Sequence, residues 1–509
     1  MYGKLKSLKG WGEKRTRRIR QQTRDNTCAI ITHLTYCHEN IYLTKKRGLN
    51  MNQLETRGTE QKTENRSASS FYRTVWRWHF YAGLIFAPFL VMLAVTGSIY
   101  LFKPQIENVL YQKYYEVTPQ ENRISATAQI NAVKANYPDA SITKYRPGET
   151  DARSSEVKIA TAEASSTVFI NPYTGKIIGE LADDDRIMNK VEEIHGELMA
   201  GTIGDRIVEL VACWAIVLIV TGLFLWFPRK KAAGWSGVLI PRLRQGKKIF
   251  RRDLHAVPAF WITAGMLFLI LTGLPWSGFW GANFQSVATN QGLGYPPSIW
   301  GGDAPVSAVQ TKDVAEVPWA AETLDVPKSN VEGLVPASID DIVSIAKQQG
   351  MDPSFAISIP SDPAGVYTLS AYPAKAENEA TIHLDQYSGA VLADYRFANY
   401  GLVGKIVALG ITLHKGTEFG LINQLISLAI CLGIILVAVS GFYLWLKRKP
   451  GKGMGAPKGP PAKSIKWFIL VLIILGVLFP LVGLSLIVVW LVDFIIIRRI
   501  AVLRRFLNA

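Results

Sequence analysis

The sequence predicts an α-helical, multi-span membrane protein that carries two α+β domains on one side of the membrane. Three observations predict this fold. Apolar runs of membrane-spanning length lie at residues 80–102, 207–227, 257–280 and 425–446. Positive charge is concentrated in the polar segments on one side of these runs. The two long segments on the other side, 103–190 and 279–400, contain the same succession of helix-like and strand-like patterns.

The charge distribution predicts which segments are cytoplasmic. The formal net charge is +16, residues 229–252 contain nine Lys/Arg, and residues 447–466 contain seven; neither segment contains Asp or Glu. By the positive-inside rule these two loops and the basic N-terminal tail are cytoplasmic, and the two long segments are outside. The excess of Lys and Arg therefore reflects membrane topology and contact with anionic membrane lipid, and we expect no nucleic-acid partner.

The first 70 residues form a basic tail that we expect to be disordered. They contain no compact apolar segment with a small-residue cleavage site, so we expect no cleavable signal peptide. Met51 offers a second start, which leaves open whether residues 1–50 belong to the native protein. None of the four cysteines lies in the two outside segments, so no disulfide framework is available to them.

Each outside segment is expected to fold as a small α+β domain. Helix-like patterns lie at 125–134 and 338–347, and strand-like patterns lie at 156–160, 166–170, 356–359, 366–371 and 381–384. Both segments then contain [Asn/Asp]-x-Tyr-[Ser/Thr]-Gly, at 171–175 and 385–389, followed by a run with β-branched residues. This pattern predicts a hairpin turn in which the first side chain bonds back to the turn and the glycine adopts a positive φ.

The C-terminal apolar run, 467–497, is about 31 residues long, which is too long for one straight span and short for two. Lys466 precedes it, and Arg498 and Arg499 follow it. Basic residues at both ends favour a re-entrant hairpin that bends near Pro480 and Gly483, with both ends cytoplasmic. A single long, tilted helix is the alternative.

Four histidines lie at the ends of the main apolar runs and form two matched pairs by spacing. His79 and His255 are each followed by Thr-Gly at offsets of 17 and 18 residues. His195 and His414 are followed at offsets of 26 and 27 by Thr-Gly and Ser-Gly, respectively, and both by Trp at 31. This repetition predicts an internal duplication of a span–domain–span unit.

Topology decides which histidines can share one metal ion. His79 and His255 begin outward-running spans near the cytoplasmic face, whereas His195 and His414 precede inward-running spans near the outer face. About 27 Å of helix separates His79 from Gly97, so ligands from opposite faces cannot bind one iron. We expect two b-type haems with axial pairs His79–His255 and His195–His414. They would be non-covalent, since Cys-x-x-Cys-His does not occur. The alternative is that these histidines anchor helix ends at the membrane interface.

The sequence resembles the PepSY-associated transmembrane family, the iron-regulated bacterial inner-membrane proteins, over roughly residues 70–500. The resemblance rests on Trp78-His79, His195-Gly196, the Gly-Leu-Phe-Leu-Trp-Phe-Pro-Arg sequence at 222–229, Arg-Asp-Leu-His at 252–255 and Gly-Phe-Tyr-Leu-Trp at 441–445. The family includes siderophore reductases of the ferrioxamine-reductase type. The resemblance implies a bacterial inner-membrane, haem-dependent oxidoreductase with two periplasmic PepSY-like domains that reduces a ferric siderophore and releases Fe(II) for iron uptake.

Further side chains are candidates to support such a site. Arg77, Arg252, Arg206 and Lys415 could meet haem propionates, and headgroup anchoring is the alternative. Trp276, Trp280 and Trp300 could form a platform for the ferric chelate, and an aromatic belt is the alternative. No dinucleotide, flavin or Walker motif is present, so we expect electrons from a quinol or a cytoplasmic reductase.

Two rival functions remain from other classes. In one, the PepSY-like domains dock or regulate a peptidase or sensor without catalysis. In the other, the protein transports iron or chelate. The small number of charged residues in the spans argues against a transport path. The expected organisation is a tail (1–70), transmembrane helix 1 (71–103), a first PepSY-like domain (104–190), helix 2 (191–228), a basic loop (229–253), helix 3 (254–280), a second PepSY-like domain (281–405), helix 4 (406–447), a basic loop (448–466), the C-terminal hairpin or long helix (467–497) and a cytoplasmic tail (498–509).

Overall fold

The computed structural model describes residues 51–228, 237–294, 310–329, 335–449, 453–456 and 466–507. The expectations for residues 1–50 and for Trp300 lie outside these ranges. The chain divides into two compact units, Met1–Tyr72 and Arg73–Ala509. Helix α2 (Met51–Tyr100) begins in the tail that the sequence predicts to be disordered.

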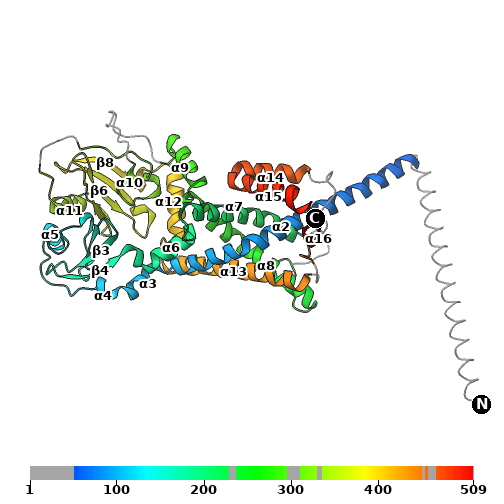
Figure 1. The fold of residues 1–509 in the computed structure, drawn as a ribbon, viewed down its shortest axis with the longest axis horizontal. Helices are drawn as coiled ribbons and strands as arrows, with labels where there is room; N and C mark the ends of the chain where they lie inside the picture. The colour runs from blue at the N-terminus through cyan, green and yellow to red at the C-terminus, as the bar shows by residue number, and fades with distance from the viewer. Residues whose placement is uncertain are drawn as a thin grey trace, which may run out of the picture. The chain divides into compact units, whose positions relative to one another are not determined.

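Within the described residues, five helical segments are long and apolar enough to cross a membrane. They are Phe71–Tyr100 of α2, Gly201–Trp226, Lys247–Trp276, Leu421–Arg448 and Pro480–Ile497. The middle three correspond to α7 (Gly201–Trp226), α8 (Lys247–Gly273) with the short η2 (Leu274–Trp276), and α13 (Leu421–Arg448). Helix α8 packs against both α7 and α13 (Figure 1). Four of these segments overlap the four main apolar runs of the sequence.

Two spans are each preceded by a separate short helix that carries a histidine. Helix α6 (Ile187–Glu197) ends before α7, and α12 (Leu402–Lys415) ends before α13. Leu198 and Met199 have φ values of 55° and 57° at the first break, and Gly416 and Gly420 have φ values of 76° and 57° at the second. A left-handed residue ends an α-helix, so single helices over 191–228 and 406–447 do not form.

The eight strands in the described part of the chain form one antiparallel sheet in the order β4-β3-β2-β1-β5-β6-β7-β8. The two expected α+β units are therefore joined, because Lys144 and Tyr145 of β1 pair with Ser358 and Ile357 of β5. The strands are β1 (Ser141–Arg146), β2 (Ser155–Ala160), β3 (Ser165–Ile170), β4 (Ile177–Ala182), β5 (Ala356–Ser358), β6 (Val366–Ala371), β7 (Ala380–Asp385) and β8 (Val391–Arg396).

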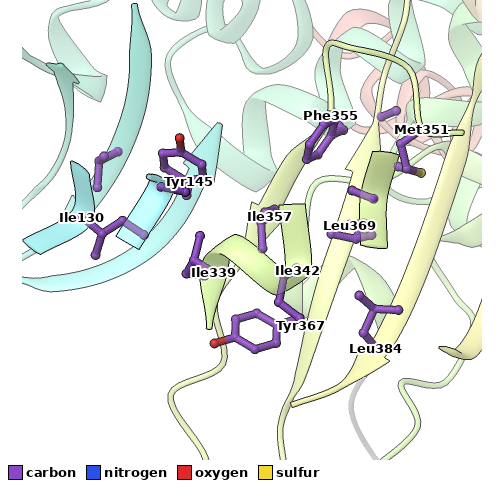
Figure 2. Packing of buried hydrophobic residues seen from close by; sticks show 14 of the residues in the cluster. Ile130, Tyr145, Ile339, Ile342, Met351, Phe355, Ile357, Tyr367, Leu369 and Leu384 are labelled. Atoms are coloured by element: carbon purple, nitrogen blue, oxygen red, sulfur yellow. The ribbon is translucent and has the colours of Figure 1, made fainter. Parts of the chain in front are cut away.

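One hydrophobic core runs across both halves of this sheet (Figure 2). Ile130 of α5 (Ala126–Asn136) and Ile342 of α11 (Ile339–Gln348) belong to it together with the sheet residues Tyr145, Ile357 and Leu369. Burial of each such side chain contributes about 1.5–3 kcal/mol. The shared core makes the two halves one structural body.

The predicted helix starts and turns are confirmed. Ser125 and Ser338 accept hydrogen bonds from backbone N–H groups in the first turns of α5 and α11. The amides of Tyr173 and Tyr387 donate to the side chains of Asn171 and Asp385 at 2.9 and 3.1 Å. The turn glycines at 175 and 389 have φ values of 72° and 69°.

The C-terminal run forms two helices, α14 (Lys466–Leu478) and α15 (Pro480–Val492), which pack against each other. The helix breaks at Phe479, immediately before Pro480. A π-helical turn, Asp493–Ile497, extends α15. The indole of Trp214 donates to Ser485 at 3.0 Å and that of Trp280 donates to the Leu478 carbonyl at 3.1 Å, which attaches this pair of helices to the rest of the protein.

The remaining short elements connect the membrane helices to the sheet, lie between β6 and β7, or follow α15. They are α3 (Lys103–Leu110), α4 (Gln112–Tyr115), η1 (Asp183–Asp185), α9 (Trp280–Asn290), α10 (Thr311–Val314), η3 (Trp319–Ala321), η4 (Ala376–Asn378), η5 (Phe397–Asn399) and α16 (Ala501–Leu507).

Candidate functional site

The structure brings the four histidines together in the two pairs that the sequence predicts. The ring centroids of His79 and His255 are 6.5 Å apart, with an angle of 70° between the ring planes. Those of His195 and His414 are also 6.5 Å apart, with an angle of 73°. We call the first pair the inner pair and the second the outer pair.

Each histidine is hydrogen-bonded through Nδ1 to a neighbouring helix. The Nδ1 atom of His79 is 2.9 Å from the Thr221 hydroxyl. The Nδ1 atoms of His195 and His414 are 2.9 and 3.0 Å from the hydroxyls of Thr96 and Thr272. The Nδ1 atom of His255 is 2.9 Å from the Val437 carbonyl and 3.3 Å from the Ser440 hydroxyl.

These contacts determine which ring nitrogen carries the proton. The hydroxyls of Thr96, Thr221 and Thr272 donate to carbonyls of their own helices at 2.9, 2.7 and 2.8 Å, so each oxygen accepts from a histidine Nδ1–H. The Val437 carbonyl can only accept, so the Nδ1 of His255 also carries its proton. The Nε2 atoms therefore present lone pairs, which is the state a metal ligand requires.

A glycine follows each of these hydroxyl residues and lies against the same histidine ring. A Cβ atom at Gly97 would lie 3.2 Å from Cε1 of His195, and one at Gly222 would lie 3.2 Å from Cε1 of His79. The corresponding distances are 3.3 Å from Gly273 to His414 and 3.1 Å from Gly441 to His255. The missing side chain thus allows the ring to approach the helix backbone. We call each Thr/Ser-Gly dipeptide a histidine cradle.

The cradles and the pairs connect different parts of the chain. Within α2, α6 and α7, Thr96 holds His195 and Thr221 holds His79. Within α8, α12 and α13, Thr272 holds His414 and Ser440 holds His255. The facing pairs, in contrast, each combine one histidine from 79–226 with one from 247–448. A complete pair therefore needs both halves of the membrane region.

The outer histidines lie outside the spanning segments, and burial keeps them neutral. Burial, followed by the facing ring of His195, lowers the pKa of His414 to about 4. Burial likewise lowers the pKa of His195. Neutral imidazole is the form that binds metals.

The geometry of both pairs fits haem iron. With metal–nitrogen bonds of about 2 Å, and ring centres roughly 1 Å behind the nitrogens, two axial imidazoles have centroids about 6 Å apart. Among the described residues, no cluster of three or more His, Cys, Asp or Glu could hold a bare metal ion. Each pair offers two ligands, which suits a metal whose four other positions are filled by a porphyrin.

A cavity of about 900 Å³ contains the outer pair and extends to the sheet. His195 and His414 line it, together with small residues of α2 such as Ala94 and Gly97. At its other end it is lined by Lys144 and other charged residues of β1 and β2. Its volume lies at the upper end of the range for ligand pockets, about 300–1,000 Å³.

Two of the proposed supporting residues line this cavity, Lys415 and Trp276. The Lys415 ammonium also lies 4.7 Å from the centre of the Tyr372 ring. Trp280 packs elsewhere, with its ring stacked 5.0 Å from that of Phe284.

Two further candidates lie at the inner end. The Arg77 guanidinium lies 5.2 Å from the centre of the Tyr81 ring. Arg252 is exposed. Neither observation assigns these arginines to a propionate.

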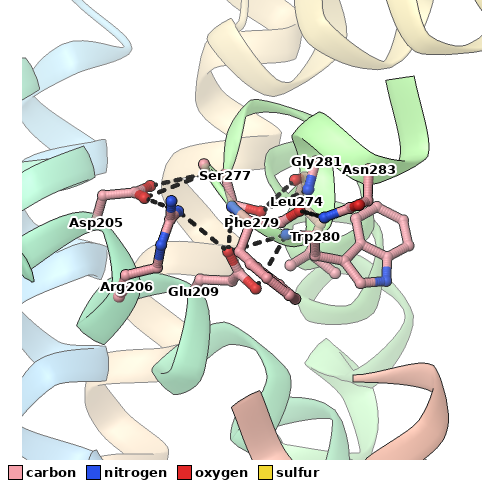
Figure 3. Close-up of polar contacts among 10 residues, drawn as sticks. Asp205, Arg206, Glu209, Leu274, Ser277, Phe279, Trp280, Gly281 and Asn283 are labelled. Atoms are coloured by element: carbon pink, nitrogen blue, oxygen red, sulfur yellow. Dashed lines mark hydrogen bonds and ion pairs between the residues drawn. The ribbon is translucent and has the colours of Figure 1, made fainter. Parts of the chain in front are cut away.

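Arg206 is bound by two carboxylates at the start of α7 (Figure 3). It lies 2.5 Å from Asp205 and 3.9 Å from Glu209. Asp205 accepts from the amide of Gly278 at 3.1 Å, and the buried Glu209 accepts from that of Phe279 at 3.0 Å. This clamp fixes the connection between α8 and α9. Sequence reasoning missed it, although a carboxylate such as Glu209 inside an apolar span is itself a signal.

A buried ion pair lies next to the inner pair. Asp253 is fully buried, and Arg242 donates to it through its side chain at 2.7 and 2.8 Å and through its backbone amide at 3.0 Å. Asp253 lies two residues before His255, so this contact fixes the helix segment that carries the histidine.

The family model for the PepSY-associated TM region matches residues 76–448. The match includes all four histidines and their cradles, and it ends before α14. A comparison with curated proteins gave no match to this chain.

Proposed function

Because the chain belongs to the PepSY-associated transmembrane family, we propose that this multi-pass membrane protein is a haem-dependent oxidoreductase that reduces a ferric siderophore. The proposal places it in the bacterial inner membrane, with the sheet in the periplasm. The excess of Lys and Arg in residues 229–252 and 447–466 supports this orientation. The repeated histidine spacings support an origin by internal duplication.

In this proposal His79 and His255 hold one b haem, and His195 and His414 hold the second. A bis-histidine haem supplies one-electron transfer when bound. The chain's own residues orient the imidazoles, because each Nδ1–H is fixed by an acceptor on a neighbouring helix. The inner pair lies on spanning helices, whereas the outer pair lines a cavity with charged walls.

One observation carries the proposal: two histidine pairs at the same spacing of 6.5 Å, each with the metal-binding tautomer fixed. A structural anchor at a helix end would need neither a facing partner nor a cradle. The cavity beyond the outer pair supports reduction of the chelate on that side, with Lys415 and Trp276 in its wall. Electrons would come from a quinol or a cytoplasmic reductase through the inner site.

The first experiment counts haem in the purified full-length protein by the pyridine haemochrome assay. We expect two b haems per chain. His79→Ala and His255→Ala should remove the same haem, and His195→Ala and His414→Ala should remove the other. His383→Gln is the control, because His383 is a buried histidine outside the two pairs: it lies in β7, and its Nδ1 atom is 3.0 Å from the Thr368 hydroxyl. A haem content near zero in the unmodified protein would refute the proposal and favour a docking role for the sheet.

The second experiment tests substrate and direction. The haems are reduced in sealed right-side-out vesicles, and an impermeant ferric siderophore is added outside. Rapid haem reoxidation with Fe(II) captured outside is the expected result. Reoxidation only after lysis would place the acceptor on the cytoplasmic side and contradict the proposed direction.

A further inference from the structure

A buried carboxyl group lies close to the outer pair without a full set of hydrogen bonds. Glu379 follows η4 and precedes β7, and its exposed fraction is 2%. Within the described part of the chain, its Oε2 atom is buried and has no hydrogen-bond partner. An ionised carboxylate in this position is disfavoured, because water no longer solvates the charge.

The neighbouring carboxylate, Glu418, is in the opposite situation. Its Oε2 atom accepts a hydrogen bond from the Thr412 hydroxyl at 2.7 Å and one from the amide of Ala376 at 3.1 Å. These contacts stabilise the negative charge of Glu418. Glu379, in contrast, has a buried carboxylate oxygen without such a contact among the described residues.

The charges around Glu379 come from three directions. Glu418, after α12, opposes its ionisation, and Lys415, at the end of α12, favours it. The hydroxyl of Tyr400, after η5, also favours the ionised form. Tyr372, after β6, is partly buried, and its buried hydroxyl has no hydrogen-bond partner in the described residues. Burial dominates these effects and raises the pKa of Glu379 to about 8.

Lys415 connects this group to the outer site. It directly follows His414, it lines the outer cavity, and its ammonium lies over the Tyr372 ring. Lys415, Tyr372, Glu379 and Glu418 therefore form one cluster at the end of α12, the helix that carries His414. An electron added at the outer pair makes this region more negative and disfavours any further ionised carboxylate nearby.

We propose that, in the pH range where Glu379 is ionised in the oxidised protein, its carboxylate takes up one proton from water when the outer site gains one electron, so that the charge of the electron is compensated within the protein. This inference rests on the proposed function, because it needs an electron-accepting group at the outer pair. The step is balanced: the site gains one electron from an added reductant, and the carboxylate becomes a neutral carboxylic acid. Glu379 acts through the electrostatic field and touches neither cofactor nor substrate.

The test measures the midpoint potentials of the two haems by potentiometric titration at several pH values. At pH values above about 8, where Glu379 ionises in the oxidised protein, the outer potential should fall as pH rises. One proton per electron corresponds to a limit of about 59 mV for each tenfold change in proton concentration. Glu379→Gln should abolish this dependence, Glu379→Asp should restore part of it, and the inner potential should not change.

Glu377→Gln is the matched control, since Glu377 lies in the same segment but is exposed and pairs with Lys375 at 3.5 Å. An infrared pH titration adds a readout that does not depend on electron transfer: the carbonyl band of a carboxylic acid should persist to about pH 8 and vanish in Glu379→Gln. If the haems are present and Glu379→Gln keeps the original pH dependence, this inference is wrong and the proposed function stands. If the protein binds no haem, both fail.

Discussion

Alanine substitution of the four cradle glycines provides a graded test of how the histidines are held. Each new Cβ would press against a single histidine ring, in the inner pair for Gly222 and Gly441 and in the outer pair for Gly97 and Gly273. Alanine also has a higher helix propensity than glycine by about 1 kcal/mol, so the helices themselves should not be weakened. Any loss of cofactor would therefore report the position of the ring.

The structure ranks the expected effects. At Gly441 the new Cβ lies 3.1 Å from Cε1 and 3.3 Å from Nδ1 of His255. Since carbon–carbon contacts are optimal from about 3.5 Å, this ring must move by about 0.4 Å, whereas a contact of 3.3 Å requires only about 0.2 Å. A functional site must be held to within about 0.5 Å, so a displacement of about 0.4 Å approaches the limit, and changes around a metal ligand typically cost 10–100-fold in affinity. We expect about tenfold weaker haem binding at the inner site in Gly441→Ala and near-normal binding at the outer site in Gly273→Ala.

Haem occupancy of each site is measured by reduced-minus-oxidised spectra during titration of haem into the apoprotein. Gly97→Ala and Gly222→Ala should be intermediate and should affect different sites, so each variant serves as a control for the other. Normal inner binding in Gly441→Ala, or loss of the outer haem in that variant, would refute the assignment of cradles to histidines.

Two predictions concern the charged pairs around the sites. Arg242→Leu should destabilise the protein by about 3–5 kcal/mol, because the fully buried Asp253 loses its partner. The double variant with Asp253→Leu should recover much of this loss of stability. Thermal unfolding in detergent compares the two variants, and equal melting temperatures would contradict the argument. Burial alone would raise the pKa of Asp183, but Lys158 at 2.8 Å and Ser165 at 2.6 Å lower it overall. The stabilisation from the ionised Asp183 is thus complete above its unfolded pKa of about 3.9 and is lost as pH falls through the lower folded value. Asp183→Asn should have a lower melting temperature than the unmodified protein at neutral pH but the same melting temperature at pH values below the folded pKa of Asp183. A difference in melting temperature that does not change with pH would rule this out.

Local sequence patterns predict the local structure of this protein well. Ser125 and Ser338 identify the helix starts, and the repeated Tyr-containing turns place Gly175 and Gly389 at positive φ, because these features depend on a few adjacent residues. The histidine pairs were also predictable, since topology and spacing restrict which rings can meet.

Features that depend on distant or unusual backbone contacts were not predictable. The pairing of β1 with β5 joins segments that are about 200 residues apart, and a strand pattern does not specify its partner. Leu198 adopts a left-handed conformation that its side chain disfavours, so nothing in the sequence marks the end of α6 there. Arg206 looked like a partner for an anionic ligand, but the adjacent Asp205 and the buried Glu209 already bind it.

The cradle contacts and the histidine pairs join different parts of the chain, and this constrains the order in which the protein is assembled. The outer pair needs residues from Thr96 to His414, and the inner pair needs residues from His79 to Ser440. A ribosome must therefore synthesise most of the chain before the outer pair can assemble, and α13 must enter the membrane before the inner one is complete. If the pairs hold haem as proposed, cofactor loading would be completed late in biogenesis, and a translation product that stops before residue 414 would lack the outer pair and the Ser440 contact of the inner pair.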